Sequence, residues 1–138
     1  MSQPAPELNC HDCGSAMARG KKKVTFEYKG ASIEVDQPGW YCRKCGEAVL
    51  TTQDVKATEP AFVELKARVQ GVLTPAEVRA IRTRLRLSQR RASALLGGGP
   101  RSFQKYESGT AMVSRPMSNL MRLLDKYPDQ LGELDEVG

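Results

Sequence analysis

The four cysteines of the chain form two C-x2-C pairs, Cys10–Cys13 and Cys42–Cys45, and no other feature limits the possible folds as strongly. Glycine follows each pair directly, at Gly14 and Gly46, which is typical of the tight turn that wraps a backbone around a metal ion. Two such turns supply four thiolates in the tetrahedral arrangement that Zn²⁺ accepts, with Zn–S bonds of about 2.3 Å. We therefore predict one zinc ion per chain. Its role is structural, because four sulfurs leave no open position for water or substrate.

Other uses of the cysteines fit the sequence less well. A single C-x-x-C can be a redox pair, but two pairs, each with its glycine, favour a metal site. The N-terminus carries no apolar signal segment and the chain has no run of about 18 apolar residues, so we expect a cytoplasmic protein without a membrane partner. Cytoplasmic cysteines are more often metal ligands than disulfides. The single histidine, His11, is expected at the surface because the cysteines already fill the coordination shell.

The residues between the cysteine pairs predict a small β domain. Apolar and polar residues alternate through Val24–Tyr28 and again through Ile33–Val35, and Lys29-Gly30 between them predicts a hairpin turn. Ala48–Leu50 is expected to add a further strand. A domain of this size, residues 9–50, has too little apolar core to hold together without its metal.

The flanks of this domain are predicted as follows. Met1–Leu8 is polar and contains proline, which indicates a flexible lead-in, and Lys21–Lys23 is expected in a solvated loop. A helix from about Glu59, with Pro60 in its first turn, would lead away from the zinc domain. Gly71 is the expected break, which divides the chain into domains 1–70 and 71–138.

The stretch Leu87–Gly109 predicts two short helices joined by a glycine turn. Ser88 is a good N-cap for the first helix, whose Ala92, Leu95 and Leu96 form an apolar stripe. Gly97–Gly99 would end that helix and reverse the chain.

The second helix of this stretch is predicted at Arg101–Ser108, with Pro100 in its first turn and with Phe103 and Tyr106 pointing inward. Two helices in this arrangement are typical of a helix-turn-helix, in which the second is the recognition helix.

Three more helices complete the predicted second domain. Thr74–Glu77 reads as a capping box that begins a helix over Thr74–Arg86. A helix over Arg115–Lys126 is expected to bury four residues, and Asp129–Leu134 predicts a last short helix. The four are Leu120, Leu123, Leu124 and Tyr127. The fold class is therefore α+β, a small zinc-bound β domain followed by an all-α domain of five helices.

The distribution of charge favours DNA as the partner of the second domain. Eight basic residues and no acidic ones lie between Arg79 and Tyr106, whereas the whole chain has a net charge of only +5. An ordinary helical hairpin would show the same apolar pattern, but a solvated helix face normally mixes charges of both signs. The eight are Arg79, Arg82, Arg84, Arg86, Arg90, Arg91, Arg101 and Lys105.

The predicted DNA contacts lie on the two helices of the motif. Arg101, Ser102 and Lys105 are expected to face outward from the recognition helix. Gln89 and Arg90, at the start of the preceding helix, are placed to contact the DNA backbone.

Two motifs resemble known families. The pattern LSQ…A..L.G at 87–98, followed by Tyr106-Glu107-Ser108-Gly109, resembles the Xre/Cro family of helix-turn-helix repressors. The run GGG…F.KYE.G followed by LLDKYPDQLGEL, joined upstream to two C-x2-C pairs, resembles the MqsA family of type II antitoxins, and the likeness extends from Cys10 to Leu134.

The second resemblance implies a specific function. In that family the N-terminal domain binds zinc and the cognate toxin, an mRNA interferase, while the C-terminal domain dimerises and represses the operon at a palindromic operator. Carried over, the four cysteines are the zinc ligands, and Arg101 and Lys105 take the two base-reading positions. The best-known members carry Asn and Arg there, whereas Arg and Lys both favour the O6 and N7 atoms of guanine.

The residues alone lead only to a zinc-stabilised DNA-binding protein. One alternative is therefore a helix-turn-helix transcription regulator without a toxin partner. An enzyme that uses the thiols is the other alternative, and it is disfavoured by the single histidine and by the lack of a Ser/His/Asp set or a phosphate loop. We expect the chain not to be an enzyme.

Overall fold

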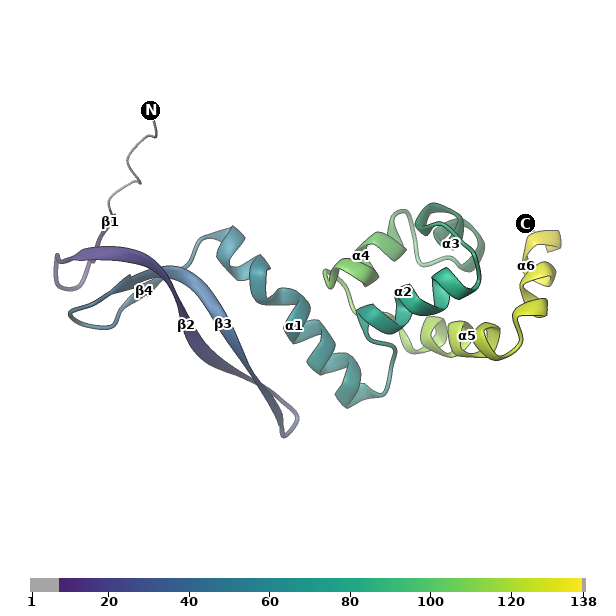
Figure 1. The fold of residues 1–138 in the computed structure, drawn as a ribbon, viewed down its shortest axis with the longest axis horizontal. Helices are drawn as coiled ribbons and strands as arrows, with labels where there is room; N and C mark the ends of the chain where they lie inside the picture. Colours follow the sequence, from purple (N-terminus) through teal and green to yellow (C-terminus); the bar gives the residue numbers. More distant parts are fainter. Residues whose placement is uncertain (1–7, 138) are drawn as a thin grey trace, which may run out of the picture. The chain divides into compact units, whose positions relative to one another are not determined.

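The computed structural model describes residues 8–137, which pack as two compact units (Figure 1). The first unit combines the chain up to Phe26 with Ile33–Thr58, and the second combines Glu27–Ser32 with the chain from Glu59 onward. Apart from the hairpin tip, the division by packing therefore falls between Thr58 and Glu59. The boundary expected at Gly71 stays a prediction. The lead-in expected at Met1–Leu8 lies outside the described residues except for Leu8.

Four strands form a single sheet in the order β1-β2-β3-β4. Their bounds are Leu8–Asn9 (β1), Ala16–Tyr28 (β2), Ala31–Cys42 (β3) and Ala48–Val49 (β4). β1 pairs antiparallel with the start of β2, and β4 pairs antiparallel with the end of β3. The hairpin turn at Lys29-Gly30 is confirmed, with both residues in the left-handed region.

The two long strands extend further than the sequence indicated. Lys21–Lys23 lies within β2 and is exposed, so the expectation of a loop there was wrong. The alternation of half-buried and exposed residues begins only at Val24, which is why the polar half of β2 gave no strand signal. The sequence also gave no sign of β1, which is only two residues long.

The apolar core of the first unit is small. It consists of Cys10, Met17 and Cys42, with Leu8, Trp40 and Val49 packed against it. A second anchor is the buried carboxylate of Asp54, which accepts two hydrogen bonds from Arg19 at 2.8 and 2.9 Å. The Arg19 guanidinium holds the pKa of Asp54 well below its usual range. So little apolar burial leaves the unit dependent on such polar anchors and on its cysteine site.

Helix α1 (Thr52–Gln70) begins seven residues before the predicted start, and Pro60 lies inside it rather than in its first turn. The start is fixed by a reciprocal cap. The amide of Asp54 donates to the Thr51 hydroxyl at 3.2 Å, and the amide of Thr51 donates to the Asp54 carboxylate at 2.9 Å. This cap was missed because the proline was read as a start signal.

The second unit continues with α2 (Pro75–Arg84), α3 (Gln89–Leu96), α4 (Ser102–Ser108), α5 (Arg115–Lys126), a 3-10 turn η1 (Pro128–Gln130) and α6 (Leu131–Val137) (Figure 1). The capping box at Thr74 and the bounds of α5 are confirmed. α2 ends two residues early, since Arg86 adopts the left-handed conformation with φ 60°. The count of five helices was inexact, because the last predicted helix is a 3-10 turn followed by α6.

The core of the second unit surrounds Phe103 and Met121, which are both fully buried. The predicted inward face of α5 was partly wrong, because Leu123 and Tyr127 are 55% and 51% exposed. The buried residues of this helix are Met117, Ser118, Met121 and Leu124. Their spacing of three and four residues places Leu123 on a different side of the helix. Among residues 8–137, no helix is long and apolar enough to cross a membrane.

Candidate metal centre and nucleic-acid interface

The two C-x2-C segments fold into turns of the same shape. In the first, the amide of Gly14 donates to the carbonyl of Cys10 at 2.8 Å, and in the second the amide of Gly46 donates to Cys42 at 3.1 Å. Both glycines have positive φ, +75° and +81°, which a residue with a side chain rarely adopts. This requirement explains the glycine that follows each pair in the sequence.

The structure brings all four predicted ligands together. The four sulfur atoms lie within 4.8 Å of one another, and the shortest separations are 3.4 Å between Cys10 and Cys45 and 3.5 Å between Cys13 and Cys42. A zinc ion with four sulfurs at about 2.3 Å places those sulfurs roughly 3.8 Å apart. Each close pair joins one cysteine from each turn, and all four are free thiols. The cluster therefore fits one tetrahedral metal ion, and the donor set favours zinc.

The surroundings of the cluster distinguish the two cysteines of the second turn. Hydrogen bonds from the backbone amides of Cys45 and Lys44 lower the pKa of the Cys42 thiol to about 6. The pKa of Cys45 is raised to about 12, because its contact with Cys10, its burial and the neighbouring sulfurs outweigh the backbone hydrogen bond from Glu47, which lowers it. A thiol with a raised pKa, such as that of Cys45, is protonated and must release its proton when a metal ion binds.

His11 lies outside the four-sulfur cluster. Its side chain is 70% exposed and stands 3.6 Å from the carboxylate of Asp12. The expectation that it is a surface residue is confirmed.

The glycine turn positions α4 against α3 in the second unit. Ser88 caps α3 as predicted, with its hydroxyl accepting from the amide of Arg91 at 3.0 Å. In the turn, a Cβ atom added to Gly98 would lie 2.6 Å from the hydroxyl of Tyr106. Gly98 also has φ +92°, so both its conformation and its space require glycine. The resulting pair of short helices is a helix-turn-helix.

The helix predicted as the recognition helix, α4, starts later than expected. α4 begins at Ser102, and Arg101 is its N-cap residue in the left-handed conformation with φ 60°. Pro100 and Arg101 therefore belong to the turn and not to the helix. In this turn Gly97–Gly99 and Arg101 all have positive φ.

Ser102 was wrongly expected to face outward. Its side chain is buried, and its hydroxyl donates to the carbonyl of Gly97 at 3.0 Å and lies 3.1 Å from the hydroxyl of Ser93. Ser102 thus locks the start of α4 onto α3. The outward position on this stretch of α4 belongs to Gln104, which the sequence reasoning did not single out. Its spacing from buried Phe103 and Tyr106 was the available signal.

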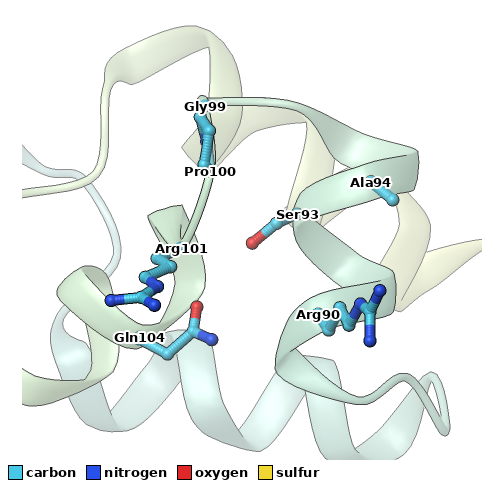
Figure 2. Close-up of a pocket in the computed structure, with 7 residues that line it drawn as sticks. All are labelled: Arg90, Ser93, Ala94, Gly99, Pro100, Arg101 and Gln104. Carbon is cyan, nitrogen blue, oxygen red and sulfur yellow. The ribbon is translucent and has the colours of Figure 1, made fainter.

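The exposed sides of α3 and α4 meet in a shallow hollow of about 460 Å³ (Figure 2). Figure 2 shows Arg101 and Gln104 side by side on one wall and Arg90 on the other, with Ser93 between them. The rest of the lining is Ala94, Gly99 and Pro100. Of the predicted DNA-binding residues, Arg90 and Arg101 therefore lie in one hollow.

The remaining predicted contacts lie near the hollow without lining it. Lys105 is exposed on α4, and Gln89 is half-buried at the start of α3. The side chains of Arg90, Arg101, Gln104 and Lys105 make no hydrogen bond or ion pair with the part of the chain that the structure describes. These groups are therefore available to an external partner.

Three of the eight clustered basic residues are neutralised by acids from distant parts of the sequence. Arg82 pairs with Glu107, Arg84 with Asp125, and Arg91 with Asp135. The basic stretch is therefore less cationic than its sequence indicated. Among residues 8–137, five of its members have no ion pair. The five are Arg79, Arg86, Arg90, Arg101 and Lys105.

The pair of Arg82 and Glu107 ties α2 to α4. Two hydrogen bonds of 2.7 and 2.9 Å join the guanidinium and the carboxylate, whose side chains are only 15% and 6% exposed. A third bond runs from Arg82 to the carbonyl of Leu87 at 2.8 Å. Its hydrogen bond with Glu107 raises the pKa of Arg82. This pair therefore fastens α4 to α2.

A four-cysteine centre on a small sheet and a helix-turn-helix in a second unit define a protein with a candidate metal centre and a candidate nucleic-acid interface. The family model of MqsA, the antitoxin component of bacterial toxin-antitoxin systems, matches residues 8–135, and the chain belongs to this family. Antitoxin MqsA of Escherichia coli (strain K12) is 29% identical over 127 residues, which cover 91% of this chain and 95% of that protein. The resemblance and the expectation of a non-enzymatic protein are confirmed.

Proposed function

We propose that this chain neutralises a cognate mRNA interferase toxin through its N-terminal domain and represses its own operon by binding DNA through its C-terminal domain. The observation that carries the proposal is the family match, which spans both units almost from end to end. Both activities belong to the cytoplasm, where a reduced four-thiol site is stable. The zinc ion is held by Cys10, Cys13, Cys42 and Cys45 and stabilises the fold without taking part in chemistry.

The test of the toxin-binding function is co-expression with the product of the neighbouring gene. We expect this chain to relieve the growth arrest that the toxin alone causes. Arg101→Ala is the matched control, because a change at the N-cap of α4, in the second unit, should leave neutralisation intact. Growth arrest that persists in the presence of the folded, metal-loaded chain would contradict the proposal and leave the alternative, a zinc-stabilised transcription regulator without a toxin partner.

DNA binding is supported by the cationic, unpaired side chains on one side of the helix-turn-helix. A single α4 of seven residues reads too few base pairs to select one site in a genome. We therefore propose that two chains form a homodimer on a palindromic operator, with half-sites about 34 Å apart or a multiple of that distance. Gln89 and Arg90 contact the phosphate backbone, while Arg101 and Lys105 read bases.

These roles predict different losses for two variants that remove the same charge. Arg101→Ala should weaken binding to the operator by about 1–3 kcal/mol and binding to random DNA much less. Arg90→Ala should weaken binding to the operator and to random DNA to a similar extent. It should also reduce the slope of log K against log salt concentration by about one. Both side chains are exposed and unpaired among the described residues, so neither change should affect folding. Titration of both DNAs at two salt concentrations measures the difference.

Each of the two variants serves as the control for the other. Equal losses on the operator and on random DNA for Arg101→Ala would mean that Arg101 contributes only diffuse positive charge. A loss confined to the operator for Arg90→Ala would place Arg90 among the base-reading residues instead.

A further inference from the structure

We propose that Gln104 is a third base-reading residue and that it selects an adenine in each operator half-site. The inference rests on the proposed DNA binding and adds to it a residue and a base. Neither the basic cluster nor the motif spacing pointed to Gln104, because the side chain is uncharged.

The structure fixes the direction in which Gln104 projects. Its neighbour Phe103 is completely buried and Tyr106 is 9% exposed, and their rings pack edge to face at 5.4 Å. Because these two define the inner side of α4, Gln104 is left on the outer side, where it is exposed. The buried hydroxyl of Ser102 and the carboxylate of Glu107 hold the two ends of the helix against further rotation.

Gln104 also lies close to Arg101, the residue proposed to read a base. It lines the hollow together with Arg101, and Figure 2 shows the two side chains next to each other. Arg101 directly precedes α4, and Gln104 lies two residues beyond the first residue of the helix, where each residue advances about 1.5 Å, compared with about 3.4 Å for one base-pair step. The base that Gln104 reaches is therefore adjacent, or next but one, to the base that Arg101 reads.

The chemistry of the side chain selects adenine. No other group in the described part of the chain bonds to the Gln104 amide, so its donor and its acceptor are both free. In the major groove, Nε2 can donate to adenine N7 while the adenine N6 amino group donates to Oε1, and only adenine offers this pair. Arg101 and Lys105 favour guanine. The three residues together therefore read a half-site that contains adenine beside guanine.

The experiment is selection of binding sites from random double-stranded DNA by the full zinc-loaded chain and by three variants. The wild-type chain should enrich a palindrome with an invariant adenine in each half-site. Gln104→Ala should lose the preference at that base pair alone and bind the selected operator about 10- to 100-fold more weakly, with unchanged affinity for random DNA. Gln104→Glu should shift the preference there toward cytosine, because a carboxylate accepts from cytosine N4. Gln53→Ala, an exposed glutamine on α1, is the matched control and should select the wild-type site.

The outcomes separate this inference from the function on which it rests. If the wild-type chain enriches no sequence, the proposed operator binding fails, and the role of Gln104 fails with it. If it enriches a palindrome but Gln104→Ala selects the same bases with the same strength, only the inference is overturned. An equal loss of affinity on operator and random DNA also overturns it, because Gln104 then contacts a phosphate.

Discussion

Cys42→Ser should unfold the N-terminal unit and leave the helices of the C-terminal unit melting nearly as in the wild-type chain. The reason is that a structural zinc site supplies on the order of ten kcal/mol to the domain that holds it. Among the described residues of that unit, the apolar core contains three buried residues, two of which are cysteines of the cluster. Wild-type protein should contain one zinc per chain, measured by elemental analysis, and Cys42→Ser close to none. The loss of order should appear in Cys42→Ser as the loss of the dispersed backbone amide resonances of residues 9–50.

The exposed histidine next to the cluster offers the control. His11→Ala should retain one zinc per chain and the wild-type melting curve, because His11 lies outside the four-sulfur set. An N-terminal unit that is fully ordered in protein prepared without metal would contradict a structural role for zinc. Loss of zinc in His11→Ala would instead place the histidine among the ligands.

Glu107→Gln should destabilise the C-terminal unit by about 3–5 kcal/mol, since it leaves the buried guanidinium of Arg82 without its counter-charge. That guanidinium also bonds to the carbonyl of Leu87 and cannot turn out to solvent without breaking this contact. The loss is measured as the shift of the denaturant midpoint in a zinc-loaded protein. Operator affinity should fall only under conditions in which the unit begins to unfold.

The exposed pair of Arg84 and Asp125 provides the comparison. Its two hydrogen bonds of 2.8 and 2.9 Å are as short as those of the buried pair, but the side chains are 58% and 33% exposed. Asp125→Asn should therefore cost only a small fraction of what Glu107→Gln costs. Equal losses for the two variants would show that burial does not determine the contribution of these pairs.

Features encoded by neighbouring residues could be predicted from the sequence. The four cysteines, the hairpin turn, the caps at Thr74 and Ser88 and the glycine turn each depend on a short stretch of chain, and the structure contains all of them. The start of α1 was placed too late because a proline in the interior of a helix resembles a start signal. The reciprocal cap at Thr51 and Asp54 begins the helix earlier than the proline indicated.

Features that depend on distant residues could not be predicted. The basic stretch was predicted to face DNA because it contains no acidic residue, but the acidic partners of three of its arginines lie 25 to 44 residues further along the chain. Ser102 was expected outside because Phe103 and Tyr106 were assigned to the inner side of the helix, whereas its hydroxyl bonds to Gly97 and Ser93 in the turn and in the preceding helix. The predicted inward face of α5 included Leu123 and Tyr127, whereas Met117 and Met121 are buried there.

Neither compact unit is continuous in sequence, and this limits how such a protein can be assembled by recombination. The second unit takes Glu27–Ser32 from the hairpin, and the ring of Tyr28 packs edge-on against Phe62 while its hydroxyl accepts from Gln70. A single genetic crossover between the hairpin tip and α1 would separate the tip from the helix on which it packs. New combinations of a metal unit with a helix-turn-helix unit therefore require compensating substitutions at these contacts, and simple domain shuffling does not suffice.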